Sequence, residues 1–494
     1  MAVMLSPSVL TRELDYTTYV AHVSTSVLGL VGGATKGEFN KATFISSPED
    51  FIRRFGIPTP DSLSTYAALQ YLAEGNQLWY VRVGDGDQEA SSVTVNDGAG
   101  AELGEDVLTF TALSPGTWGD NLHVVISNVS GISFRLVVGQ NSTPVESYDC
   151  SLDSDSENYV ESVLDASRFI TATDLLDGEG TTVLAGTYTL AGGNDGLDTL
   201  SLSDIEGVEG EGLQLFKNVE EIDINILAVP GLSSTGTVAN AIISICESRG
   251  DCFGLIDPPM GLDAQEVVAW HNGEGSGEDD PGAALNSSYA AAYYPWLQIN
   301  DPYYNTTRWV PPSGFVAAQF AYNDRVANPW SAPAGLKRGR LVRPLNLETS
   351  SDKGTRDFLY SGGNAINPIV NFRQDGITIF GQRTLQRKPS ATDRINVRRL
   401  LLTIRKAVSS STAYLVFDPN DEFTWNEWRG LVEPFLNSVK RARGLYDYRV
   451  QMQPTDQEID TNTMPGRVLI QPTRTAEFIP IDFVLLATGA SFPE

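Results

Sequence analysis

The stretch STSVLGLVGG, residues 24–33, gives the first strong indication of the fold. Its apolar run ends at paired glycines, which is typical of a buried strand that stops at a turn. Downstream, Ser47 is a helix N-cap followed by proline and early acids, so the sequence predicts a helix over 48–55. A second helix is expected over about 63–73 and a second strand in QLWYVRV, residues 77–83. This order predicts a βαβ unit with a right-handed crossover.

The composition of the chain changes at about Ala90. From there to Gly196 it is rich in Ser, Thr, Gly and Asp, and it contains short strand-like runs such as DVLTFTAL, LHVVISNV and SFRLVVG separated by turn residues. We interpret residues 90–196 as an inserted, mostly β, acidic domain.

Alternating strands and helices return after GGNDG, residues 192–196. The pattern predicts strands at 224–231 and 252–259 and helices at 237–250 and 262–271. The core fold therefore resumes after the insert, and the fold class is α/β (α+β) with several domains.

The final third of the chain gives three more predictions. Apolar residues at helical spacing indicate a helix over 393–408, and TAYLVFDPND is expected to form a strand that leads into a turn. The next helix is expected to begin at a capping box made by Thr424 and Glu427 and to run to about Arg443, with a kink near Pro434. Its predicted packing stripe is Trp425, Trp428, Leu431, Phe435 and Val439.

Bulk properties limit the possible functions. The 494 residues suit two to four domains, and no apolar run is long enough to span a bilayer. The start lacks a signal peptide, and Cys150, Cys246 and Cys252 have no metal-site spacing, so we expect buried free thiols in a soluble protein made in a cytoplasm. A net charge of −28 argues against general nucleic-acid binding.

The charge is unevenly distributed along the chain. Residues 337–494 hold 22 Lys and Arg against 17 Asp and Glu, which leaves residues 1–336 with 45 acidic residues against 12 basic ones. Two interpretations remain open: a solvated acidic domain, or complementary contacts between the acidic and basic parts of different copies.

Catalytic motifs are weak. The histidines His22, His123 and His271 lie in no HExxH or comparable motif, and the glycines of residues 29–37 lack the GK[ST] of a phosphate loop. The run DSDSE at 153–157 lacks the later Gly and Glu of a calcium loop. We therefore predict no catalytic, cofactor-binding or metal-binding residues and no cofactor. An α/β hydrolase or nucleotide-binding enzyme, with Asp257 at a strand end, remains the alternative from another class.

A strand is expected very near the C-terminus. In IPIDFVLL the residues Ile479, Ile481, Phe483 and Leu485 fall on one face of an extended chain. The few small and turn-forming residues that follow cannot complete a hairpin, so this strand must pair with an edge elsewhere in its own chain or in another.

A series of sequence blocks runs along the chain. The series begins with VSTSVLGLVGGATKGEFNKATFISSPEDFIRRFG and AALQYLAEGNQLWYVRVGDG and continues through SSYAAAYYPWLQINDP, VPPSGFVAAQFAYND and NPWSAPAG. It extends through GITIFGQRTL, RINVRRLLLTIRKAV and VFDPND to PGRVLIQPTRTAEFIPIDFVLL. Together these blocks resemble the contractile tail sheath proteins of bacteriophages. Nearly the whole chain is covered in the right order, although the insert shows little beyond SPGTWGDNL and its closing GGNDG.

The resemblance implies a structural subunit of stacked six-membered rings that surround a tail tube and contract to drive the tube through a host envelope. It implies an N-terminal arm at 1–23, core segments at 24–89 and 197–474 around the outer domain at 90–196, and a C-terminal arm at 475–494. The arms would complete the mixed sheet of an α/β sandwich in neighbouring subunits. The implied N-terminal arm residues are Val9, Leu10, Leu14 and Tyr16, and the C-terminal ones are the four apolar residues above.

The implied partners are other copies of the chain, the tube protein, and baseplate and terminator proteins, without nucleic acid or membrane insertion. The implied location is the virion tail, after assembly in the host cytoplasm; a tailocin or another phage-derived injection device is the alternative. Candidate inter-subunit basic patches are Lys337, Arg338, Arg340 and Arg343, or the cluster from Arg394 to Lys406. Lys440, Arg441 and Arg443 are candidate tube-facing residues, unless they only stabilise the end of their helix.

Overall fold

The computed structural model describes residues 24–98, 104–179, 182–233, 235–275, 281–361 and 363–480. The described chain forms two compact units. Val23–Thr403 belongs to one, and the described residues from Ile404 onward belong to the other. No helix in the described ranges is long and apolar enough to cross a membrane.

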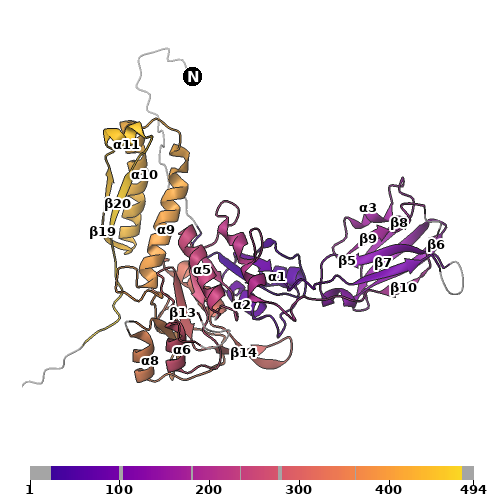
Figure 1. Cartoon of the computed structure of the whole chain (residues 1–494), viewed down its shortest axis with the longest axis horizontal. Coiled ribbons are helices and arrows are strands. Elements are labelled where there is room, and N and C mark those ends of the chain that lie inside the picture. The colour runs from indigo at the N-terminus through magenta and orange to yellow at the C-terminus, as the bar shows by residue number, and fades with distance from the viewer. Residues whose placement is uncertain are drawn as a thin grey trace, which may run out of the picture. The chain divides into compact units, whose positions relative to one another are not determined.

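An eight-stranded mixed sheet organises the first unit, in the order β18-β17-β13-β12-β11-β1-β3-β2. Figure 1 labels one of its strands, β13. The strands from β17 to β3 pair in parallel, and the two edge strands β18 and β2 run antiparallel to their neighbours. Parallel central strands are buried on both faces, which explains the continuous apolar runs in the sequence. The bounds are β1 Leu28–Gly32, β2 Ala42–Ile45, β3 Leu78–Arg82, β11 Ile226–Ala228, β12 Phe253–Ile256, β13 Ala290–Tyr294, β17 Ile366–Phe372 and β18 Gly376–Ile379.

Helices cover both faces of this sheet. On one face, Leu28 and Leu30 pack in a core shared with α1 (Pro48–Phe55), α2 (Leu63–Leu72) and α7 (Ser313–Val326). On the other face, Val27 and Val31 share a core with Ile205, Phe216 and Ile242 of α4 (Leu202–Glu206), η2 (Gly212–Lys217) and α5 (Gly236–Arg249). Near the other end of the sheet, α6 (Ala264–His271) and α8 (Lys353–Tyr360) add a further core. This face alternation follows from the two-residue period of the strands.

The local signals at the start of the chain produce the expected elements. Ser47 caps α1 by accepting a hydrogen bond from the Asp50 amide, and Pro48 occupies the first turn. Phe51 and Phe55 of α1 pack against Tyr80 of β3 with ring centroids 5.1 and 4.7 Å apart. The predicted β1 and β3 are parallel neighbours, so the βαβ pairing is confirmed.

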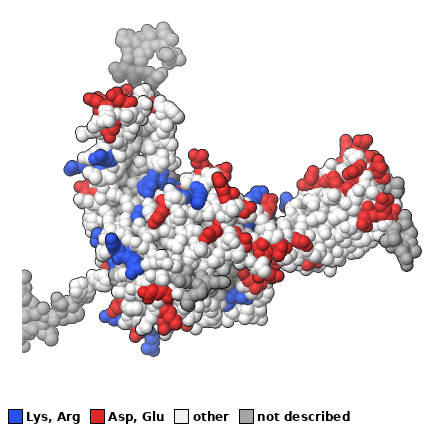
Figure 2. Space-filling view, viewed as in Figure 1, with Lys and Arg blue, Asp and Glu red and all other residues white. Residues whose placement is uncertain are grey.

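Two antiparallel sheets form most of residues 90–196. One has the order β4-β5-β9 and the other β10-β6-β7-β8, and their inner faces share one apolar core. The entering and leaving chains pair through Glu89 and Asn194. The charged side chains on the visible face of this part are mostly Asp and Glu (Figure 2). The bounds are β4 Ser92–Asn96, β5 Asp106–Ala112, η1 Thr117–Asn121, β6 Leu122–Ser130, β7 Ser133–Gln140, β8 Thr143–Ser151, α3 Val160–Leu164, β9 Ile170–Asp174 and β10 Gly186–Thr189.

The remaining elements are a small sheet in the first unit and a helix–hairpin assembly in the second. The small sheet has the order β15-β14-β16, with bounds Thr306–Val310, Leu297–Asp301 and Asn346–Leu347. In the second unit, α10 packs along β19 (Figure 1). The bounds are α9 Ile395–Thr412, which spans the division between the units, η4 Ala413–Leu415, α10 Glu422–Arg441, β19 Leu445–Met452, α11 Asp456–Asp460 and β20 Gly466–Pro472.

Two predictions for the final third are wrong. TAYLVFDPND forms no strand, because α9 continues to Thr412 and the chain then turns at Phe417, whose φ of 79° ends any extended run. The capping box at Thr424 is absent as well. Asp421 caps α10 three residues earlier by accepting from the Phe423 and Thr424 amides.

The predicted packing stripe of α10 is only partly right. Three members of the stripe are buried: Trp428, Leu431 and Val439. Two apolar residues outside the predicted stripe, Val432 and Leu436, are buried as well. Trp425 and Phe435 are only half-buried.

Candidate functional site

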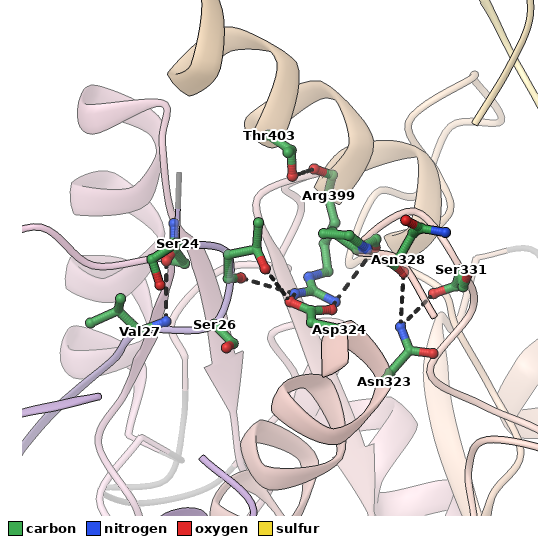
Figure 3. Close-up of polar contacts among 12 residues, drawn as sticks. Ser24, Ser26, Val27, Asn323, Asp324, Asn328, Ser331, Arg399 and Thr403 are labelled. Atoms are coloured by element: carbon green, nitrogen blue, oxygen red, sulfur yellow. Dashed lines mark hydrogen bonds and ion pairs between the residues drawn. The ribbon is translucent and has the colours of Figure 1, made fainter. Parts of the chain in front are cut away.

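The described chain begins beside a buried ion pair that ties three distant segments together (Figure 3). The guanidinium of Arg399, on α9, donates to both carboxylate oxygens of Asp324, on α7, at 2.9 and 2.6 Å. The hydroxyl of Thr25 donates to the same carboxylate at 2.7 Å, and its carbonyl accepts from Arg399 at 3.0 Å. Thr25 is therefore fixed at the point where residues 1–23 join the core. We call Thr25, Asp324 and Arg399 the junction.

Burial makes the junction sensitive to the loss of either charge. The side chains of Arg399 and Asp324 are only 4% and 7% exposed. Arg399 also lies over the Phe320 ring at 4.6 Å. A buried charge that loses its partner costs several kcal/mol, so the pair sets the geometry of the segment that it holds. Beside it, the Asn323 amide donates to the carbonyls of Asn328 and Ser331 and fixes the turn after α7.

The β19–β20 ribbon is a two-stranded sheet whose outer edges pair with no other described strand. One of its faces rests on α10, where Gly466 lies against the Trp428 ring and the Tyr448 hydroxyl donates to the Glu433 carbonyl. An isolated two-stranded ribbon is marginally stable in water, and an open edge is a template for another strand. The ribbon is therefore a candidate acceptor for added strands.

The chain leaves β20 without folding back as a strand in the described residues. The Thr473 amide donates to the Gly444 carbonyl at 3.0 Å. Five residues later Phe478 is 78% exposed, and Ile479 is 75% exposed. Seven of the predicted arm residues lie outside the described residues: Ile481, Phe483, Leu485, Val9, Leu10, Leu14 and Tyr16. Ile479 is thus the one predicted arm residue whose surroundings the structure gives.

The structure brings together the four cations of the first predicted basic patch. All four line one groove of about 350 Å³ between the end of α2, one face of α7 and the chain at 336–343: Lys337, Arg338, Arg340 and Arg343. Arg338 is half-buried, and its Nε donates to the Ala332 carbonyl, whereas the other three are exposed. In the part of the chain that the structure describes, no carboxylate forms an ion pair with those three. We call this the basic groove.

The second predicted basic cluster is not a continuous exposed patch. Arg398 is buried, with its Nε donating to the Ser288 carbonyl and its guanidinium over the Tyr289 ring at 4.1 Å. Arg399 is buried in the junction. Helical periodicity places consecutive arginines on neighbouring inward positions, which a count of charges along the sequence does not show.

The candidate tube-facing residues lie at the end of α10. Lys440 donates to Asp447 of β19 at 2.8 Å, and this contact holds the pKa of Asp447 below its usual range. Arg441 and Arg443 are exposed, and Arg443 has a φ of 63°. Lys440 therefore joins the helix to the ribbon, and the two arginines project outward.

The residues considered for catalysis have structural surroundings. Asp257 is buried at the end of β12, and its carboxylate accepts from the amide and hydroxyl of Ser313 at 2.8 and 2.6 Å, at the start of α7. Burial raises the pKa of Asp257 to about 7. His271 is buried, and burial lowers its pKa to about 4. Within the described ranges, no group of three or more His, Cys, Asp or Glu side chains is placed to hold a metal ion.

Sequence reasoning missed the junction and a second buried arginine, Arg82. The Arg82 guanidinium donates to the carbonyls of Gly37 in the core and of Pro115 and Asp195 in the insert, and so links the core to the insert. Burial lowers the pKa of Arg82 to about 10. A charged residue inside the buried run QLWYVRV was the available signal for Arg82. For Asp324 and Arg399, 75 residues apart, no local signal exists.

Comparisons with known proteins find similar sequences and similar structures. Residues 206–385 match the profile of the phage tail sheath protein central domain, and residues 387–485 match that of the phage tail sheath C-terminal domain. The tail sheath protein of Vibrio phage KVP40 is 30% identical over 405 residues, which is 77% of this chain and 57% of that protein. The chain thus spans somewhat more than half the length of that relative.

Solved structures show the same fold. The sheath tail protein of Listeria innocua has a TM-score of 0.62 at 13% identity, with 92% of this chain and 96% of that chain covered. The sheath complex of an extracellular contractile injection system, PVC, in its contracted state, has a TM-score of 0.57 at 18% identity, with 98% of both chains covered.

Proposed function

Because this chain belongs to the phage tail sheath family, we propose that it polymerises as stacked six-membered rings around a tail tube and contracts to drive that tube through a host envelope. The structural sheath role follows from the family. What we propose beyond that role is the ring stacking, the contraction and the genome delivery that contraction would serve.

The proposal is supported mainly by two features near the C-terminus, a two-stranded ribbon and the exposed apolar segment that follows it. Among the described residues, no strand pairs with the outer edges of the β19–β20 ribbon, and the apolar segment that follows it is exposed at Phe478 and Ile479. A neighbouring copy would satisfy both by taking up residues 475–494 as an added strand, and residues 1–23 would form a second arm. Added strands gain backbone hydrogen bonds, while side-chain pockets set the register.

The energies favour two arms over one. Four or five added hydrogen bonds contribute about 0.5–1.5 kcal/mol each. Burial of four apolar side chains contributes about 1.5–3 kcal/mol each. Ordering eight residues costs roughly 1–2 kcal/mol per residue. A single arm is marginal, whereas two arms that act at high effective concentration hold a polymer together.

Contraction then requires no chemistry. The arms keep the copies connected while the folded bodies change from one packing to another, and the free energy is stored in the lattice. We propose no catalytic role, because the polar contacts of Asp257 are with Ser313 and Ser233 of its own chain.

The proposed partners follow from the same picture: other copies, a tube protein, and baseplate and terminator proteins. The exposed Arg441 and Arg443 would face the tube. The proposed location is the virion tail, after assembly in the host cytoplasm. The likeness to the injection-system sheath supports a second candidate, the sheath of a phage-derived injection device, and neighbouring genes for a capsid would separate the two.

Removal of the C-terminal arm tests the proposal. A chain that ends at Arg474 retains β20, so its melting temperature should stay close to that of the full chain. Electron microscopy of the purified full chain should show striated cylinders, and the truncated chain should remain as dispersed particles. Cylinders of normal appearance from the truncated chain would refute the proposed role of the arm.

A further inference from the structure

The basic groove has an acidic counterpart elsewhere on the same unit. We propose that the basic groove of one copy receives an acidic ridge of the next copy, made by Glu209, Glu211, Glu220 and Glu221 around η2. This inference rests on the proposed function and specifies which two surfaces meet between copies.

The groove combines positive charge with unsatisfied and apolar groups. The one carboxylate that lines it, Glu74, forms an ion pair with Arg325 at 2.7 Å. Gln70, which also lines it, is 8% exposed, and neither its Oε1 nor its Nε2 has a hydrogen-bond partner in the described structure. At the rim, Val342 is 86% exposed.

The ridge combines negative charge with apolar groups in the same way. Glu209 and Glu211 precede η2, and Glu220 and Glu221 follow it; all four are exposed, and none forms an ion pair with a described residue. Val208, which is 68% exposed, and Val219 lie among them. Exposed apolar residues ringed by charge are typical of contact surfaces.

The two surfaces lie on opposite faces of the eight-stranded sheet. The groove is built on α2 and α7, which share the core of Leu28 and Leu30. The ridge is built on α4 and η2, which share the core of Val27 and Val31. Surfaces on opposite faces cannot meet within one unit. When different patches meet between copies, the contact repeats head to tail and generates rings or helical filaments.

Charge reversal tests the pairing. The groove variant is Arg340→Glu/Arg343→Glu, and the ridge variant is Glu209→Lys/Glu220→Lys. A control with the same charge change as the groove variant is Lys353→Glu/Arg373→Glu, at two exposed positions outside the groove. The readout is the protein concentration at which the purified chain forms polymers that sediment, with circular dichroism and melting temperature as folding controls.

Each reversed variant alone should need roughly tenfold more protein or more, because two contacts change from attraction to repulsion. The control should behave like the unmodified chain. An equal mixture of groove and ridge variants should assemble again, because an alternating ring of six satisfies every contact.

Normal assembly of either reversed variant would overturn the inference, and so would a mixture that fails to assemble. If the groove variant does not fold, Arg340→Gln/Arg343→Gln replaces it. That neutral variant should assemble at higher concentration and with weaker dependence on salt, because exposed charges are screened over about 8–10 Å. Unchanged salt dependence would overturn the inference. If the unmodified chain forms no cylinders, the proposed function fails instead, which is a different result.

Discussion

The junction provides the most quantitative prediction. Asp324→Ala removes the carboxylate that accepts two hydrogen bonds from Arg399 and one from Thr25. The guanidinium then remains 4% exposed without a counter-charge. Removing one partner of a buried pair costs about 3–5 kcal/mol, so the free energy of unfolding of the first unit should fall by that amount.

The control is an exposed ion pair made by Arg325, the next residue along α7. Arg325 pairs with Glu74 at 2.7 Å, but their side chains are 57% and 38% exposed. Exposed pairs contribute about 0–1 kcal/mol, so Glu74→Ala should change the free energy of unfolding by no more than that. The double variant Asp324→Leu/Arg399→Met leaves no unpaired charge, and it should lose less than half as much as Asp324→Ala.

Urea denaturation measures these free energies, and hydrogen exchange locates the effect. Amide exchange at residues 25–27 should accelerate in Asp324→Ala and remain unchanged in Glu74→Ala, because only the first change releases Thr25. A loss below about 1 kcal/mol for Asp324→Ala, or equal exchange in both variants, would refute the assigned role of the pair.

Three further predictions follow from other contacts. Burial raises the pKa of Asp257 to about 7, so between about pH 4 and pH 7 the folded chain holds a proton that the unfolded chain has released. The free energy of unfolding should therefore fall as the pH rises through this range, by up to about 1.4 kcal/mol per pH unit. Urea titrations across that range should show this slope in the difference from Asp257→Asn, and parallel curves would contradict it. Arg82→Met should accelerate proteolysis near residues 85–89 and 192–198 by freeing the insert, and an unchanged cleavage pattern would argue against that anchor. Arg441→Glu/Arg443→Glu should yield sheaths that no longer match tube length in electron micrographs, with folding unchanged; normal length control would remove the tube contact.

The parts of the fold that the sequence predicted are those set by neighbouring residues. Ser47 and Pro48 define the start of α1, and β1 ends at the paired glycines Gly32 and Gly33, because caps and turns act over a few positions. The same reasoning failed at residues 412–421, where apolar residues suggested a strand. There Thr412 ends α9, residues 413–415 form the short helix η4, and Phe417 is fully exposed with a φ of 79°, so no buried face stabilises an extended run.

The candidate surfaces were predictable to different degrees. The cations of the basic groove are close in sequence, so their clustering was visible as a run. The acidic ridge and the junction depend on tertiary structure. Nothing local brings Asp324 to Arg399 or shows that Arg398 points inward, because those contacts depend on how α7 and α9 pack.

The most direct measurement is a cryo-EM reconstruction of the polymer in which the chain beyond Pro472 is traced. We predict that Ile479, Ile481, Phe483 and Leu485 pair with the β19–β20 ribbon of a different copy. A map in which residues 475–494 return to the ribbon of their own molecule would contradict the account.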